Sequence, residues 1–195
     1  YLHEAKPADD RPFRPSRTPI QTRNGTIWVG VQDTLYRYEE ATDNFSGIRL
    51  PGNNEAANFI RLIYEDREGF LWIATQGNGA FHFDPRTMIF FEHYYHEPAN
   101  PNSLSNNQVS AFIQNGNELW IGTTGGGLNV LDLKMGQIDR YTGTPPDPFG
   151  VNSETIRDAW EDNRGNIWLG SYYDGLYQFK SSQRIFSNFD QNTFT

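Results

Sequence analysis

Four of the five tryptophans recur at a nearly constant interval, and this periodicity constrains the fold more than any other feature of the sequence. Trp28, Trp72, Trp120 and Trp168 are separated by 44, 48 and 48 residues. A self-similar unit of this length is typical of arrays in which each copy is one supersecondary unit stacked on its neighbours. The 195 residues provide room for four such units.

The residues around each tryptophan form aligned columns that indicate a short buried strand. An aliphatic residue stands on either side of each Trp, and a very small residue follows two positions after it: Gly30, Ala74, Gly122 and Gly170. A strand that is apolar on both faces is buried on both faces, and a small residue allows a neighbouring backbone to approach closely. We therefore expect each of the four tryptophans to lie at a buried contact between units.

Turn signals before and after this strand divide each unit into four strands. A column three residues before each Trp contains residues that favour a positive φ angle: Gly25, Gly69, Asn117 and Gly165. A second turn downstream of the Trp strand is also rich in glycine. Short apolar runs flank both turns, and no sustained helical periodicity separates them. The sequence therefore predicts four-stranded antiparallel sheets without crossover helices.

These sheets predict an all-β chain of β-propeller blades. A single four-stranded sheet cannot bury both of its faces, whereas stacked blades can. We predict one partial propeller domain over residues 1–195, with blades at approximately 13–50, 56–95, 104–142 and 153–190. Two arrangements are open: a closed four-blade ring, or an arc of a larger propeller. The loops between blades and the second turns would share one rim, and the first turns would share the other.

Composition narrows the possible partners. The net charge of −8 and the pI of about 4.9 give an acidic surface, which repels phosphate backbones and argues against nucleic acid as a partner. The absence of cysteine excludes disulfides and thiolate zinc sites. No apolar run approaches the roughly 18 residues that a membrane helix needs. Because the first residue is Tyr1 rather than Met, we expect any signal or membrane segment to lie outside this sequence.

The aligned columns resemble the two-component regulator propeller repeat. The resemblance rests on three stretches, EDREGFLWIATQGNGAFHFD, NPNSLSNNQVSAFIQNGNELWIGTTGGGLNVLD and EDNRGNIWLGSYYDGLYQF, and extends over nearly the whole chain from about Ile20 onward. It implies a ligand-sensing segment of the periplasmic region of a hybrid two-component histidine kinase of Bacteroidetes, anchored in the inner membrane. Such sensors recognise oligosaccharides released from complex glycans.

The resemblance also implies partners and limits. Sensors of this family usually carry two rings of about seven blades, so four copies favour an arc that packs against the remaining blades of the same protein. The kinase module would lie elsewhere in that protein, and this segment would not itself be an enzyme. An arc exposes apolar blade faces at both ends, so it is also a possible homo-oligomer. We expect no cofactor.

The second turn is the predicted ligand site, because it is where the copies differ most. In the second, third and fourth copies it reads QGN, TGG and YYD. Two tyrosines and a carboxylate combine apolar ring faces with hydrogen-bonding groups, which suits sugars. The alternative interpretation is that the tyrosines cover the end of the last blade. The predicted ligand-binding residues are Tyr172, Tyr173, Asp174, Gln76, Asn78 and Thr124.

Other chemistries find less support in the sequence. A carbohydrate-active propeller enzyme, either a hydrolase or a lyase, would need converging carboxylates, for which only Asp174 and Glu154 are suitably placed. A protein-interaction scaffold would be favoured by a basic or strongly apolar rim.

His93 and His96 point to opposite faces of an extended strand, so we predict no metal site. We also predict no catalytic residue. The recurring Asp66 is interpreted as an acceptor of backbone N–H groups in its hairpin.

Overall fold

The computed structural model describes residues 19–52, 57–142, 150–180 and 185–190, and these residues form strands and turns with no helix. Within them, no helix is long and apolar enough to cross a membrane. Sixteen strands form four antiparallel sheets of four strands, each paired in chain order. The prediction of four-stranded antiparallel propeller blades is confirmed.

Each sheet is one blade, and the blades follow one another along the chain. The first blade comprises β1 (Ile20–Gln21), β2 (Ile27–Val31), β3 (Thr34–Glu39) and β4 (Asn44–Arg49). The second comprises β5 (Ile60–Glu65), β6 (Leu71–Thr75), β7 (Ala80–Asp84) and β8 (Ile89–Tyr94). The third comprises β9 (Val109–Asn115), β10 (Glu118–Thr123), β11 (Leu128–Asp132) and β12 (Ile138–Tyr141). The fourth comprises β13 (Ile156–Glu161), β14 (Ile167–Ser171), β15 (Leu176–Lys180) and β16 (Ile185–Phe189).

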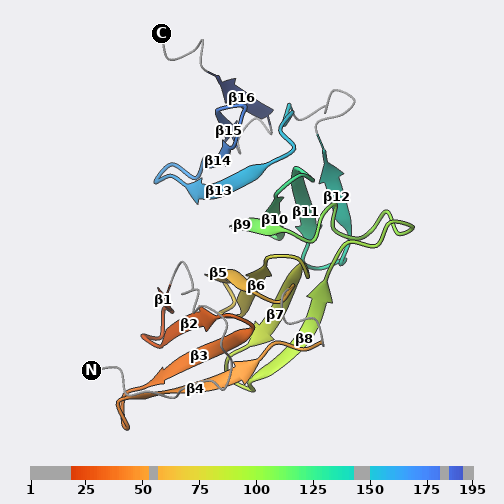
Figure 1. The fold of residues 1–195 in the computed structure, drawn as a ribbon. Helices are drawn as coiled ribbons and strands as arrows, with labels where there is room; N and C mark the ends of the chain where they lie inside the picture. The colour runs from red at the N-terminus through yellow and green to blue at the C-terminus, as the bar shows by residue number, and fades with distance from the viewer. Residues whose placement is uncertain (1–18, 53–56, 143–149, 181–184, 191–195) are drawn as a thin grey trace.

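The blades form an open arc rather than a closed ring. Figure 1 shows the first blade at one end of the arc and the fourth blade at the other. The innermost strands β5, β9 and β13 lie along the concave side, where β5 contacts β9 and β9 contacts β13. The outer strands β8 and β12 lie along the convex side.

Each interface uses the same two faces of the blade. The Trp of one blade packs on a phenylalanine of the next: Trp28 on Phe83, Trp72 on Phe112 and Trp120 on Phe179, with ring centroids 5.6, 6.1 and 4.7 Å apart. The residues on either side of the Trp point toward the preceding blade, where they complete that interface. Burial of these side chains supplies the main force that holds neighbouring blades together.

The expectation that each aligned tryptophan is buried between blades is correct in three copies and wrong in the fourth. Trp28, Trp72 and Trp120 are buried, but Trp168 is only half-buried. Its face points away from the third blade, at the end of the arc, where no described residue provides the phenylalanine of a following blade. The small-residue column also needs a correction: a Cβ added to Gly30 would lie 2.4 Å from the Ile60 side chain, so a side chain rather than a backbone approaches it.

The first turns follow the predicted pattern in three blades. Gly25, Gly69 and Gly165 have φ angles of 89°, 87° and 76°. In the third blade the positive φ angle of 61° belongs to Gly116 rather than to Asn117, so that prediction is wrong. The cause is a shorter hairpin, in which Asn115 pairs directly with Glu118 and only two residues form the turn.

Candidate functional site

The second turns share one local structure, which fixes the positions of the predicted site residues. Each begins with a hydroxyl residue whose oxygen donates to the carbonyl of the glycine four positions later, at 2.8–3.0 Å. The hydroxyl residues are Thr75, Thr123 and Ser171, and sequence reasoning missed this column. The two residues that follow each hydroxyl are therefore held on the rim by the backbone, and their side chains are free to vary.

The tyrosines of the fourth blade are the most exposed aromatic side chains of this rim. Tyr172 is 54% exposed and Tyr173 is 79% exposed, with their rings edge to face at a centroid distance of 4.5 Å. The guanidinium carbon of Arg157 lies 4.6 Å from the centre of the Tyr172 ring. This cation–π contact orients the ring, and Tyr173 keeps most of its surface in solvent. The Asp174 backbone N–H donates to the Ser171 hydroxyl at 2.8 Å.

The structure brings Thr124 next to the tyrosine loop. Thr155 pairs with Thr124 in an isolated β-bridge, and its carbonyl accepts the Tyr172 N–H at 3.1 Å. The Thr155 hydroxyl also accepts the Gly125 N–H at 3.1 Å. The Thr124 hydroxyl oxygen is closed off from solvent and has no hydrogen-bond partner among the described residues. This hydroxyl therefore lies behind the rim surface, and Thr124 contributes to the site by positioning the backbone of the tyrosine loop through Thr155.

Gln76 and Asn78 belong to the second blade, and no described contact joins them to the tyrosine loop. Gln76 is exposed, and its backbone N–H donates to the Phe59 carbonyl at 2.9 Å. The Asn78 side-chain amide donates to the Asn58 side-chain oxygen at 2.6 Å. That bond ties the turn to the preceding linker, so Asn78 has a structural task. The six predicted residues therefore divide into a tyrosine–Thr124 group and a separate pair.

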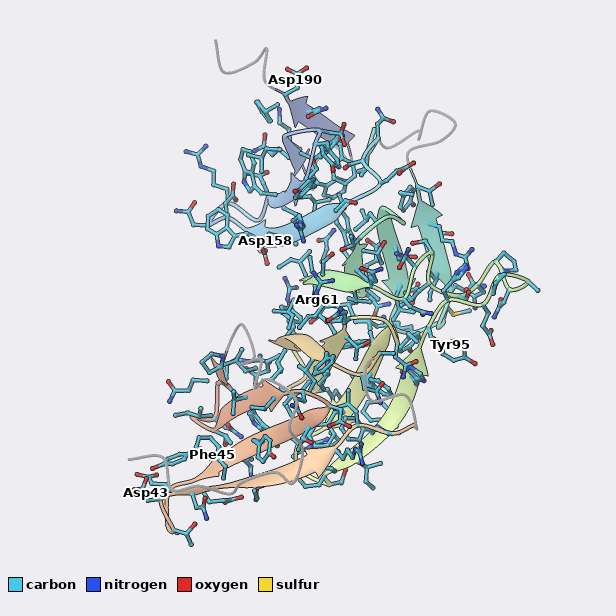
Figure 2. All side chains as sticks on the ribbon, viewed as in Figure 1. Asp43, Phe45, Arg61, Tyr95, Asp158 and Asp190 are labelled. Carbon is cyan, nitrogen blue, oxygen red and sulfur yellow. The ribbon has the colours of Figure 1, made fainter. Side chains whose placement is uncertain are left out.

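Arg157 is a rim residue that sequence reasoning did not identify. The pairing of β13 with β14 skips one residue between Ile156 and Asp158, and Arg157 is the bulged residue. The same irregularity occurs after Ile60 in β5, where Arg61 is bulged. A bulge re-aims a side chain, and here the Arg157 guanidinium lies over the Tyr172 ring. Figure 2 shows the other bulged residue, Arg61, on the concave side of the arc. The signal in the sequence is an Arg directly after the first apolar residue of both strands.

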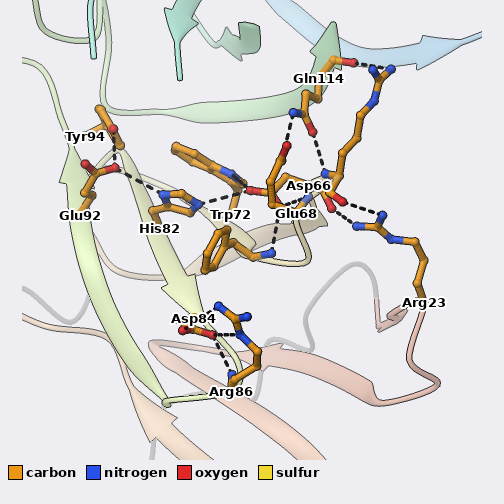
Figure 3. A network of polar contacts seen from close by, with 12 residues as sticks. Arg23, Asp66, Glu68, Trp72, His82, Asp84, Arg86, Glu92, Tyr94 and Gln114 are labelled. Atoms are coloured by element: carbon orange, nitrogen blue, oxygen red, sulfur yellow. Dashed lines mark hydrogen bonds and ion pairs between the residues drawn. The ribbon is translucent and has the colours of Figure 1, made fainter. Parts of the chain in front are cut away.

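A buried polar cluster occupies the interior of the second blade (Figure 3). The His82 ring stacks on Trp72 with centroids 3.9 Å apart, and its two nitrogens lie 3.3 Å from oxygens of Asp66 and Glu92. Burial raises the pKa of Asp66, but hydrogen bonds from His82, Trp72 and the Phe70 backbone outweigh it and hold that pKa below its ordinary value. The cluster lies inside the sheet stack, so we assign it to stability rather than to ligand binding.

The Asp66 carboxylate does more than the sequence predicted. One oxygen accepts the backbone N–H groups of Glu68 and Phe70 at 3.1 and 2.9 Å, which confirms its predicted role in the hairpin. The other oxygen accepts the indole N–H of Trp72 at 3.0 Å. Asp162 repeats this arrangement with Trp168. The carboxylate therefore links the turn of a blade to its central tryptophan.

The two histidines considered as metal ligands have other partners. His93 stacks on Phe81 with centroids 4.1 Å apart, and His96 Nδ1 lies 2.7 Å from the Leu104 carbonyl oxygen. Across the described ranges, no three His, Cys, Asp or Glu side chains gather in a metal-binding arrangement. Within the same ranges, no contact joins the carboxylates of Asp174 and Glu154, the pair on which the enzyme alternative depended.

Comparisons with known proteins relate the chain to one repeat family. The sequence profile described as two component regulator propeller matches residues 54–77 and 103–125. These segments contain the Trp strand of the second blade and that of the third. No curated protein matches the chain in sequence.

Solved structures show the same fold. The extracellular domains of the hybrid two component systems BT3049 and BT4673 from B. thetaiotaomicron are each 23% identical, with TM-scores of 0.70 and 0.72. The chain is covered over 89% and 95% of its length, but spans only 24% and 26% of those chains. The RRP9 WD40 repeats, at 9% identity, give a TM-score of 0.63 over 92% of this chain and 54% of theirs. The likeness establishes a blade array about a quarter as long as the bacterial domains.

Proposed function

We propose that the chain, two of whose four blades match the sequence profile of the two component regulator propeller family, is an extracytoplasmic ligand-sensing segment of a hybrid two-component sensor histidine kinase. The observation that carries this proposal is the match of that family's profile to the second and third blades. The blade array, shared with extracellular domains of bacterial two-component systems, supports it. In this role the segment binds and does not catalyse, and the kinase module belongs to another part of the protein. We place the segment in the periplasm, in a sensor anchored in the inner membrane.

The proposed ligand is an oligosaccharide from glycan breakdown, bound at the rim that carries Tyr172 and Tyr173. Two exposed rings at an angle offer apolar faces to sugar rings. The Asp174 carboxylate provides a hydrogen-bonding group on the same loop, and Thr124 holds the loop in place through its bridge with Thr155. With a net charge of −8, the protein favours neutral or cationic sugars over sulfated ones.

The test replaces the tyrosine loop with the loop of the third blade. Tyr172→Thr with Tyr173→Gly reproduces the residues at the same positions of the third copy, whose turn has the same backbone bonds. Two stacked rings contribute about 0.5–1.5 kcal/mol each, so affinity should fall by about 5- to 150-fold with little change in stability. Isothermal titration calorimetry against neutral, amino and sulfated oligosaccharides measures the effect.

The matched control is Tyr95→Ser, which removes an exposed tyrosine from the convex side of the arc. Its affinity should equal that of the unchanged protein. Unaltered affinity in the loop variant, with the fold intact by circular dichroism, would refute the tyrosine site. Absence of binding to every sugar tested would refute the oligosaccharide proposal itself.

The remaining blades of the same protein are the proposed partners of the arc ends. Trp168 is half-buried, and the interface positions of its blade face outward. Among the described residues, the Gly79 and Gly127 N–H groups donate to linker carbonyls of the following blade, at 2.9 and 2.7 Å, whereas Gly175 has no such acceptor. A following blade would supply it. A second copy of the chain could use the same face to form a homo-oligomer.

A further inference from the structure

The indole N–H groups of the aligned tryptophans differ in one blade. Three of them donate to a carboxylate of their own blade at 3.0 Å: Trp72 to Asp66, Trp120 to Glu118 and Trp168 to Asp162. These carboxylates stand six residues before the Trp (Asp66, Asp162) or two residues before it (Glu118). In the first blade the residues at these two positions are Thr22 and Thr26. Among the described residues, the Trp28 indole N–H has no acceptor, although Trp28 is only 1% exposed.

In the described contacts, neither threonine accepts the Trp28 indole N–H. The Thr22 hydroxyl is turned into its own hairpin, where it lies 2.7 Å from the Asn24 side-chain oxygen and 2.9 Å from the Thr26 carbonyl oxygen. The hairpin backbone is otherwise the same as in the second blade, with bonds from Thr22 N to Thr26 O and from Gly25 N to Thr22 O. The first blade therefore keeps the turn and lacks only the acceptor.

A cavity of about 240 Å³ lies where that acceptor is missing. It lies between the first and second blades, and its lining includes Thr22, Trp28, Arg37, Glu65 and Arg86. The Trp28 side chain is buried as a whole, but its indole nitrogen is not one of the buried polar atoms that lack a partner, so the N–H opens into this cavity. A polar cavity can hold a group that accepts such an N–H. The volume accommodates a molecule of the size of a monosaccharide and is too small for a chain of sugars.

Two guanidinium groups border the cavity, and among the described residues each has one terminal nitrogen that no carboxylate engages. Arg37 donates from Nε and one Nη to Glu39, and the described contact of its other Nη is the sulfur of Met88 at 3.9 Å. Arg86 pairs through Nε and one Nη with Asp84, and its side chain is 73% exposed. The lining carboxylate, Glu65, is balanced by Arg23 at 3.3 Å.

We propose that this cavity binds a small carboxylate, such as a uronic acid or another organic acid of similar size. The carboxylate accepts the Trp28 N–H, as the protein's own carboxylates do in the other three blades, and pairs with the free donors of Arg37 and Arg86. The site lies on the rim opposite the tyrosine loop and does not depend on the proposed sensing function.

The test follows the Trp28 indole N–H by proton–nitrogen NMR. The probes are sodium glucuronate, sodium acetate and neutral glucose, with chloride holding the ionic strength constant. Glucuronate should shift one indole signal saturably. Acetate should shift the same signal more weakly, since it fills less of the cavity, and glucose should not shift it. A shift that does not saturate, or an equal shift with glucose, would overturn the proposal and leave water as the occupant.

Two variants identify the site independently. Thr22→Asp places a carboxylate where Asp66 stands in the second blade, so it should satisfy Trp28 internally and abolish the glucuronate response. Arg37→Gln removes a cation while keeping a polar side chain of similar length, and should weaken binding about tenfold. The tyrosine-loop variant described above should respond as the unchanged protein does. An unchanged response in both Thr22→Asp and Arg37→Gln would refute the site.

Discussion

Replacing Trp120 with alanine should lower the free energy of unfolding by about 3–5 kcal/mol, the range for truncating a buried large aromatic side chain. The Trp120 ring is 3% exposed and packs edge-on against Phe179 at 4.7 Å and near Phe186 at 5.6 Å. A buried aromatic side chain removes about 150–250 Å² from water, which at about 25 cal/mol per Å² corresponds to roughly 4–6 kcal/mol before the neighbours relax. The loss falls on the interface between the third and fourth blades.

Trp160→Ala is the matched control, because it removes the same side chain from a different environment. Trp160 is 62% exposed and pairs with Trp168 across β13 and β14, the register in which Tyr64 pairs with Trp72. With under half of its surface buried, its removal should cost about 1–2 kcal/mol. Urea unfolding followed by far-ultraviolet circular dichroism measures both variants without relying on tryptophan fluorescence. Equal losses of stability would refute the assignment of Trp120 to an interface and Trp160 to the surface.

Two further predictions concern the turns. Lowering the pH should destabilise the protein below the ordinary carboxyl pKa of about 4, because the depressed pKa of Asp66 contributes stability that is lost as the pH falls through its folded value. Asp66→Asn should flatten this part of a plot of urea midpoint against pH, and an unchanged slope would contradict the role of the carboxylate. Gly127→Ala should cost at least about 2 kcal/mol more than Gly116→Ala, since both have positive φ angles but only the Cβ at Gly127 would meet a backbone oxygen, that of Tyr141 at 2.2 Å. Equal urea midpoints would contradict the steric argument.

The blade and its register could be predicted because they repeat. A residue type that occurs in the same column of several copies, such as the glycine of the first turn, reports a requirement of the blade itself. The exceptions depend on the neighbouring blade or on the length of the hairpin, which the residue types in a column do not report. Trp168 occupies the same column as Trp120, but its burial depends on a neighbouring blade. Asn117 occupies the glycine column, but a shorter hairpin transfers the positive φ angle to Gly116.

The residues of the candidate site were harder to predict from the repeat than the blade itself. Departure from the repeat identified the exposed tyrosine loop, since residues that the blade does not require are free to project from it. Departure alone could not distinguish a free amide from a bonded one, and the Asn78 amide proved to be held by Asn58. Nor could it reveal Arg157, whose position beside the Tyr172 ring results from a bulge in β13. Side-chain direction at a bulge depends on strand pairing, which the spacing of residues does not specify.

The interfaces also give the array a direction. Each one joins the Trp face of a blade to the opposite face of the next, which carries aliphatic side chains and a phenylalanine, so the two ends of the arc differ in chemistry. At one end the exposed face carries Trp168, with its indole N–H bonded to Asp162. At the other end it carries Ile27, whose side chain is exposed. Contact between two like ends would place two Trp faces, or two of the opposite faces, against each other. A Trp face would then lack the phenylalanine that it contacts inside the arc. Head-to-tail continuation reproduces the existing interface, so a partner that closes or extends this arc should present the face opposite to the one it covers.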